Sequence, residues 1–138
     1  MINIKGLSDW YENLAEENLD KMDLFYAENF FFKDPFNEIT GREKVKGIFK
    51  HMFETLDEPH FVFIDVIIQE KSAFVTWDFI FKIRGTHFKI HGSSHLKYNE
   101  DDKIIYHRDY WDVGEELLLK IPVVKSLYGL FRKKLALP

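Results

Sequence analysis

The hydrophobic pattern of this chain changes its period near Pro59, and this change limits the possible folds more than any other feature. Before Pro59, apolar residues recur every three or four positions, as they do in helices. After it come four long runs rich in Val, Ile, Phe, Thr and Tyr, over residues 60–70, 72–84, 86–98 and 103–112. Helices followed by an antiparallel meander predict the α+β class.

Three N-terminal helices are expected before the change of period, because each of three stretches carries an apolar stripe on one face. These stretches are residues 6–16, 19–27 and 41–56. Thr40 and Glu43 match a capping box that would start the third helix. A short strand at 30–34 and a loop at 35–40 would precede it, and a C-terminal helix is expected from Pro122.

The size and charge of the chain exclude several classes of protein. With 138 residues, 46% of them hydrophobic, residues 1–138 are predicted to form a single domain. A net charge of -4 gives no sign of the clustered positive surface that binds nucleic acid. The absence of cysteine excludes a disulfide scaffold and a thiolate metal site, and it suits a reducing compartment.

The sequence also predicts a cytoplasmic protein. The first ten residues lack the basic-then-apolar pattern of a signal peptide. No apolar run reaches the roughly 20 residues that a membrane-spanning helix needs. We therefore expect neither secretion nor a membrane span.

Aromatic residues and the second β-prone run raise questions that the sequence leaves open. Aromatic side chains make up 17% of the chain, with 14 Phe, which suits either a ring-lined cavity or a densely packed core. The run at 72–84 is apolar on both faces, so one face should meet the helices and the other a partner or the C-terminal tail. This predicts a homodimer through the outer face of the sheet.

The C-terminal helix would carry apolar residues on one side and basic residues elsewhere. The basic residues are Lys125, Arg132, Lys133 and Lys134. Such a helix can lie on a membrane surface or bind a partner. The alternative is a lid packed on its own sheet or on a second subunit.

The last β-prone run, Lys103-Ile-Ile-Tyr-His-Arg-Asp-Tyr-Trp-Asp112, holds the strongest candidate for chemistry. If the strand alternates without a bulge, His107, Asp109 and Trp111 share one face with Ile105. By the same rule Asp78 shares its face with Phe74, Thr76 and Ile80. Periodicity alone does not decide which face is inside.

This run, followed by Glu115-Glu116 and Ile121-Pro122, resembles the closing strand and tail of the limonene-epoxide hydrolase family. That family lies within the NTF2-like superfamily, which also holds SnoaL-like and ketosteroid-isomerase-like proteins. The resemblance implies a cone in which three N-terminal helices pack in a strongly curved antiparallel or mixed sheet. In the family, an Asp on the closing strand activates water and a second Asp, on an earlier strand, protonates the epoxide oxygen. Asp109 falls on the first position and Asp78 on the second, with no gap needed between them.

Three departures from the family argue against epoxide hydrolysis. Thr76 stands where the family has an Arg that bridges the two carboxylates. Phe32 and Asp34 stand where it has a Tyr and an Asn that hold the water, and Phe has no hydrogen-bonding group. If Asp78 and Asp109 still share a pocket, repulsion and desolvation would keep one protonated, giving an acid and a base. Alternatively, each Asp hydrogen-bonds structural groups near a strand end.

The same alignment points His91 and Ser93, on the third β-prone run, into the pocket. The predicted catalytic residues are thus Asp109 and Asp78. The predicted binding residues are His91, His107, Trp111, Ser93, Thr76, Ile80, Phe32, Asp34, Met52 and Leu56. His91 and His107 could alternatively hold a metal between two strands, but we predict no metal and no cofactor.

Two functions of different classes follow. The first is an enzyme that carries out cofactor-free acid–base chemistry, isomerisation or hydration, on a small, largely apolar molecule. The second is a non-catalytic ligand-binding or dimerisation module, because one fold can host both. Either way the expected partner is a small apolar or semi-polar molecule, and neither nucleic acid nor a membrane span is expected.

Overall fold

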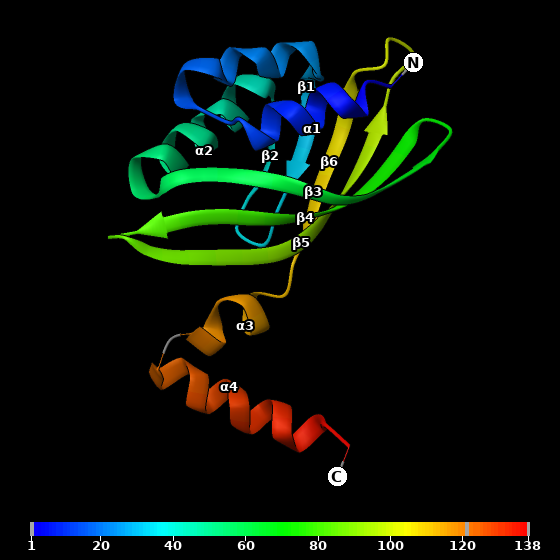
Figure 1. The fold of residues 1–138 in the computed structure, drawn as a ribbon. Coiled ribbons are helices and arrows are strands. Elements are labelled where there is room, and N and C mark those ends of the chain that lie inside the picture. Colours follow the sequence, from blue (N-terminus) through cyan, green and yellow to red (C-terminus); the bar gives the residue numbers. More distant parts are fainter. Residues whose placement is uncertain (1, 121, 138) are drawn as a thin grey trace.

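The computed structural model describes residues 2–120 and 122–137 (Figure 1). Its helical elements are α1 (Ile4–Glu12), the 3-10 helix η1 (Glu16–Leu24), α2 (Arg42–Thr55), α3 (Val113–Glu116), the 3-10 helix η2 (Leu118–Lys120) and α4 (Pro122–Leu135). Its strands are β1 (Tyr26–Lys33), β2 (Glu38–Thr40), β3 (Asp57–Gln69), β4 (Ser72–Ile83), β5 (Thr86–Tyr98) and β6 (Ile104–Tyr110). The α+β prediction is confirmed.

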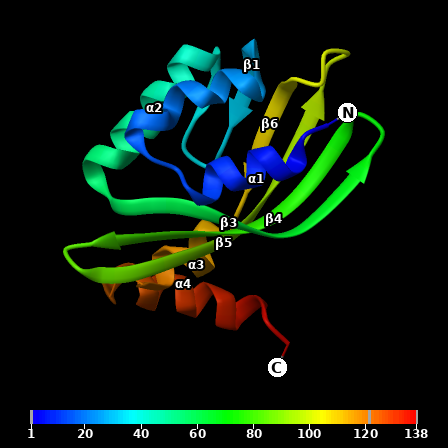
Figure 2. The ribbon, with the colours of Figure 1, turned by 45° about the horizontal axis from the view of Figure 1, so that its top comes forward.

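The strands form one mixed sheet in the order β2-β1-β6-β5-β4-β3. The pairs β3–β4, β4–β5 and β5–β6 are antiparallel, which is the predicted meander. β1 joins the sheet beside β6 and runs parallel to it, so the beginning and the end of the sheet-forming chain lie side by side. Figures 1 and 2 show the sheet curving around α1, η1 and α2.

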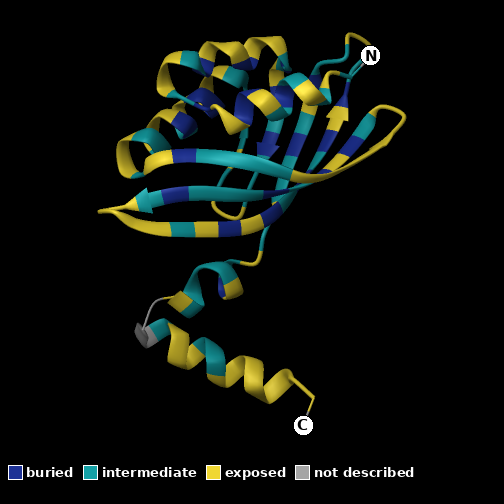
Figure 3. Cartoon of the chain, viewed as in Figure 1, coloured by how far each residue is buried: buried dark blue, intermediate teal, exposed yellow. Residues whose placement is uncertain are grey.

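The core lies between these helices and the inner face of the sheet, and Figure 3 shows buried residues gathered there. α1 contributes Leu7, Trp10 and Tyr11, which fall on one face of the helix as the stripe predicted. Phe30 of β1 is fully buried opposite them. The helices therefore cover one face of the sheet.

The second expected helix begins and ends three residues earlier than predicted and is of a different type. Its apolar residues Leu19, Met22 and Phe25 are three apart, which fits the three residues per turn of a 3-10 helix better than 3.6. The helix ends at Leu24, and Tyr26 already begins β1. β1 is thus longer than the strand expected at 30–34. A short β2 forms within the segment expected to be a loop.

The capping box predicted at Thr40 is wrong. Thr40 belongs to β2, where it pairs with Phe31, and α2 begins one residue later than the motif implies. Gly41 is the N-cap, and no side chain caps the helix. Its φ of +117° favours glycine, so the turn from β2 into α2 depends on backbone freedom instead of a hydroxyl.

A bulge in β6 changes which residues of this strand face inward. Tyr98 of β5 pairs with Ile104, whereas Lys97 pairs with Tyr106, so Ile105 is an extra residue. Ile104 is fully buried and Ile105 is 43% exposed. The expectation that Ile105 shares the face of Asp109 is therefore wrong, because it assumed uninterrupted alternation.

α3, η2 and α4 extend away from the sheet on the side opposite α1 and α2 (Figures 1 and 2). The side chain of Glu116 accepts a hydrogen bond from the backbone N–H of His91, and Lys120 Nζ donates to the carbonyl of Lys89. These bonds fix α3 and η2 to β5. Ile121 of the tail motif lies outside the described residues. Among the described residues, no helix is long and apolar enough to cross a membrane.

Candidate functional site

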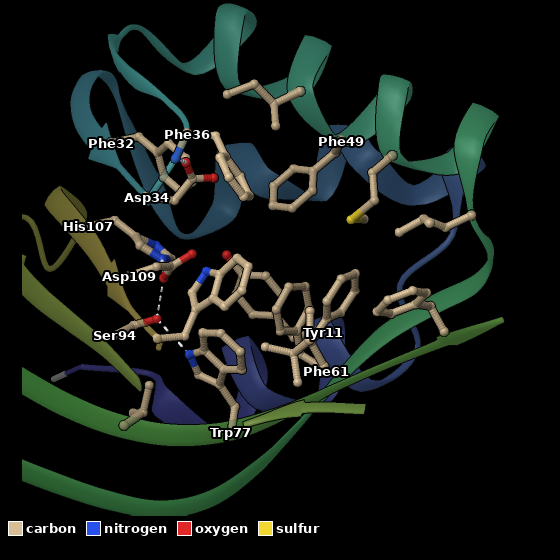
Figure 4. A pocket seen from close by; sticks show the side chains of 18 of the residues that line it. Tyr11, Phe32, Asp34, Phe36, Phe49, Phe61, Trp77, Ser94, His107 and Asp109 are labelled. Atoms are coloured by element: carbon tan, nitrogen blue, oxygen red, sulfur yellow. Dashed lines mark hydrogen bonds and ion pairs between the residues drawn. The ribbon is translucent and has the colours of Figure 1, made fainter. Parts of the chain in front are cut away.

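A cavity of about 390 Å³ lies between α1, α2 and the inner face of the sheet. Most of its wall is aromatic or aliphatic, and rings from every layer contribute. Those rings include Tyr11, Phe32, Phe36, Phe49, Phe61, Trp77, Phe79 and Trp111. Several of them appear in Figure 4. The high aromatic content of the sequence is thus used to line a cavity as well as to fill the core.

The opening of the cavity lies near Phe36. This residue lines the cavity and is still 66% exposed, so it must stand between the interior and solvent. Its ring contacts Trp111 edge to face, with the two centroids 5.7 Å apart. Leu117 from the segment after α3 also lines the cavity. The loop after β1 and the segment after β6 therefore border the entrance together.

Asp109 is the most chemically notable group in the cavity wall, and β6 places it there. Its Oδ1 atom accepts a 2.6 Å hydrogen bond from His107 Nε2 and a 2.5 Å hydrogen bond from Ser94 Oγ. Oδ2 takes no hydrogen bond from any described residue. The Asp109 side chain is only 14% exposed. One oxygen is therefore held in place while the other remains available to a bound molecule.

The contact to Ser94 continues to β4. Trp77 Nε1 donates a 2.8 Å hydrogen bond to Ser94 Oγ, and Figure 4 shows Ser94 between Trp77 and Asp109. The indole can only donate, so the Ser94 hydroxyl must accept from it and use its own proton toward Asp109. This arrangement suits an ionised carboxylate.

On its other side, Asp109 ends a chain of buried hydrogen bonds. His107 Nδ1 lies 2.9 Å from Tyr26 Oη, and Tyr26 Oη lies 2.5 Å from Tyr11 Oη. If neutral His107 donates to Asp109 from Nε2, its Nδ1 must accept from Tyr26, and Tyr26 then accepts from Tyr11. Each group in the chain is satisfied in this direction. Tyr11 also lines the cavity, so both ends of the chain reach it.

The two tyrosines stay protonated over a wide pH range. Burial raises the pKa of Tyr11 well above its usual value, and the hydrogen bond with Tyr26 only partly opposes this. Burial also raises the pKa of Tyr26, and the neighbouring Tyr11 raises it further. Both hydroxyls therefore act as hydrogen-bond donors in this site.

The structure brings seven of the predicted site residues to the cavity. They are Asp109, His107, Trp111, Phe32, Asp34, Met52 and Leu56. Asp34 has a structural task there as well, because its Oδ1 accepts from the backbone N–H groups of Phe36 and Asn37. These bonds form the turn that follows β1. Asp34 is therefore a less available carboxylate than Asp109.

The other five lie on the outer face of the sheet. They are Asp78, Thr76, Ile80, His91 and Ser93, which pair with one another or with close neighbours across β4 and β5. Asp78 Oδ1 lies 2.8 Å from His91 Nδ1 on that face. The predicted pocket shared by Asp78 and Asp109 is not formed. The alternative of a metal held between His91 and His107 is excluded as well, because these residues lie on opposite faces of the sheet.

Trp77 explains why Asp78 lies on the outer face of β4, although the ungapped alignment with the family places it in the pocket. Its ring lies directly over Gly92 of β5, where an added Cβ would come within 2.5 Å of the indole. Residue 92 must be Gly for the ring to turn inward. Trp77 inside leaves Asp78 outside, because successive side chains of a strand alternate. β4 therefore gives the cavity Val75, Trp77, Phe79 and Phe81, and no carboxylate.

Sequence reasoning did not single out Ser94, Trp77, Tyr11 and Tyr26. A usable signal existed: a buried Tyr needs a partner for its hydroxyl, so two Tyr at stripe positions indicate polar contacts in the core. No group of three or more His, Asp or Glu that could hold a metal occurs in the described part of the chain.

Comparisons with known proteins identify the fold. Three solved structures have the same fold. One is a hypothetical protein with a ketosteroid isomerase-like fold from Catenulispora acidiphila, in complex with trimethylamine. The others are an LEH-like epoxide hydrolase from M. tuberculosis and a putative SnoaL-like polyketide cyclase from a Jannaschia species. The first is 16% identical with a TM-score of 0.71, and the match covers 85% of this chain and 92% of that chain. The second is 14% identical with a TM-score of 0.69, covering 90% and 92%. The third is 12% identical with a TM-score of 0.67, covering 80% and 83%.

At these identities the structures establish the fold and nothing beyond it. No curated protein matches the chain in sequence. A family model described as the SnoaL-like domain matches residues 7–107. The predicted membership of the NTF2-like superfamily is confirmed. Because the matched region is well over half of the chain, the protein belongs to the SnoaL-like domain family.

Proposed function

We propose that this protein binds a small, largely apolar molecule in the ring-lined cavity and moves a proton on it without a cofactor. The observation that carries the proposal is Asp109: a carboxylate with one oxygen fixed by Ser94 and His107 and the other facing an apolar cavity. A base held in this way has little water to compete for it and needs no reorganisation before it reacts.

Isomerisation is the reaction that such a site supports best. Asp109 would take a proton from a carbon next to a carbonyl and return it to another carbon of the same molecule. The net change in protons and electrons is zero, so no oxidant or reductant is needed. Hydration is the second reaction in this class, in which Asp109 would take a proton from a water that attacks one carbon of a double bond and would return this proton to the other carbon.

The buried chain from His107 to Tyr11 has a supporting role in this proposal. Tyr11, Tyr26 and His107 keep the carboxylate in one orientation, because each donates its proton to the next group along the chain. Asp78 has no part in the proposal because it lies on the outer face.

Hydrogen–deuterium exchange tests the proposal with simple probe molecules in place of the natural substrate. We expect the protein to accelerate exchange at the carbons next to the carbonyl in at least one of a panel of apolar ketones and enones incubated in D2O. Exchange is followed by proton NMR, and binding by the fluorescence of Trp77 and Trp111, which both line the cavity. Saturable binding without faster exchange would instead support the non-catalytic ligand-binding module.

We also propose that the protein is a homodimer through the outer face of the sheet. Four rings form an outer row across four strands, defined here as Phe31, Tyr106, His95 and Phe74. Neighbouring ring centroids are 5.5, 5.7 and 6.2 Å apart. Ile67 pairs with Phe74 in the sheet and is 65% exposed. An extended apolar surface of this kind is a common interface between subunits.

A charge placed on this row is expected to break the dimer. Phe74→Asp should raise the dissociation constant by about 30-fold or more, because a buried ring in the interface would become an unpaired carboxylate. Sedimentation equilibrium measures this change. Leu24→Asp is the matched control, because Leu24 is 63% exposed on η1, away from the outer row. A monomeric wild-type protein would contradict the proposal.

A further inference from the structure

α4 presents an apolar surface that no other part of the described chain covers. Leu127, Phe131 and Leu135 are 67%, 62% and 72% exposed. Their spacing of four residues places them on one face of the helix, and together they are called the α4 stripe. Figure 3 shows α4 as largely exposed, and Figure 1 shows it apart from the sheet. Burying three such side chains would be strongly favourable.

The charge of the same helix is entirely positive. Lys125, Arg132, Lys133 and Lys134 are all exposed, and residues 122–138 include no Asp or Glu. On a helix, Arg132 and Lys134 lie on either side of Phe131, so the stripe is bordered by cations. An occupant of this surface must therefore combine apolar and negative groups.

α4 is also fixed to the rest of the molecule. The ring of Tyr128 packs so closely on Gly114 of α3 that a Cβ on Gly114 would overlap it. This contact, which only Gly permits, uses one edge of the apolar side of α4. The stripe itself stays open. The helix thus offers a surface with a defined orientation relative to α3.

The outer row of the sheet does not provide the negative groups that an occupant of the α4 stripe needs. Lys97 Nζ lies 4.7 Å from the centre of the Tyr106 ring, and the Arg108 guanidinium lies 4.7 Å from that of Tyr110. Two rings of that face are therefore already in contact with positively charged side chains. Docking α4 there would bring like charges together.

We propose that α4 binds flat on an anionic lipid surface. The α4 stripe would enter the boundary between headgroups and acyl chains, and the basic residues would contact the anionic headgroups. The helix has the length, the arc of apolar residues and the flanking charge of an interfacial helix, and it is too short to span a bilayer. This proposal is independent of the chemistry assigned to the cavity.

Vesicle co-sedimentation of the full chain tests the proposal. We expect binding to vesicles in which about a third of the lipid is phosphatidylglycerol, weak binding to pure phosphatidylcholine, and loss of binding as salt is added. The double variant Leu127→Asp/Phe131→Asp should lower the partition coefficient by about a hundredfold, because two apolar anchors are lost. Lys133→Gln and Lys134→Gln should each lower it about fivefold.

The matched control is Leu24→Asp, which changes an equally exposed leucine far from α4 and should leave partitioning unchanged. Circular dichroism confirms that each variant is folded. Equal binding to both kinds of vesicle, or full binding by the double variant, would overturn the proposal. A wild-type protein that binds no vesicles would also overturn it. If the double variant then breaks an oligomer, the stripe covers a second copy.

Discussion

Asp109→Asn is expected to slow catalysed proton exchange by at least about a hundredfold, which corresponds to about 2.7 kcal/mol of lost transition-state stabilisation. The amide oxygen of Asn can still accept from Ser94 and His107, so the site should keep its geometry. What is lost is the ability of the second carboxylate oxygen to take a proton. The expected result is therefore a large fall in rate with little change in ligand affinity, measured by NMR exchange and fluorescence titration.

Asp78→Asn provides the matched control for this experiment. It makes the same chemical change on another strand, but on the outer face of the sheet, where Asp78 contacts His91. We expect its exchange rate to stay within about twofold of the wild-type rate, since surface changes away from a site have small effects. Full activity in Asp109→Asn, or an equal loss in Asp78→Asn, would show that Asp109 is not the base.

The contrast between these two aspartates also shows where sequence reasoning stops. Both were expected in one pocket because they match two family positions without a gap. The side chains of a strand alternate, so an error of one residue moves a side chain from the inner face to the outer face. The β-prone composition of residues 72–84 locates β4 but cannot give its phase when both faces are apolar. Trp77 and Gly92 determine that phase, and their contact joins two strands.

The sequence predicts more of the fold than of the site. The stripe of α2 and the four β-prone runs appear as a helix and four strands, because the stripe is long and the runs are rich in β-branched and aromatic residues. Short elements and irregularities were missed, including β2 and the bulge at Ile105. A bulge adds one residue and is not visible in periodicity, yet it turns His107 and Asp109 inward together with Ile104. Site residues depend on such details more than the architecture does.

The hydrogen-bond chain was out of reach for a different reason. Tyr11, Tyr26 and His107 come from α1, β1 and β6, and only the parallel pairing of β1 with β6 brings them together. Nothing in the local sequence around any one of them indicates the other two. Each could be placed in the core by its apolar neighbours. Their mutual contact is a property of the complete fold.

The same chain leads to an expected loss of stability in alkali. In the unfolded chain, Tyr11 and Tyr26 ionise near pH 10, whereas burial raises the pKa of both in the folded protein. Above pH 10 the unfolded state therefore binds fewer protons than the folded state, so the free energy of unfolding falls as pH rises. Each tyrosine contributes a loss of about 1.4 kcal/mol per pH unit. For two of them the loss is about 5 kcal/mol at about pH 12, comparable with the whole stability of a small domain.

Urea unfolding followed by circular dichroism, between about pH 8 and about pH 12, measures this slope. Burial also raises the pKa of Tyr98, which adds to the loss in the same direction. Tyr11→Phe/Tyr26→Phe should start from a lower stability, because His107 Nδ1 loses its partner, but its stability should fall less steeply above pH 10. Tyr110→Phe, which changes a 43% exposed tyrosine, should keep the wild-type slope. A wild-type stability that stays constant up to about pH 12 would contradict the burial of these hydroxyls, because the slope depends only on the difference in proton binding between the two states.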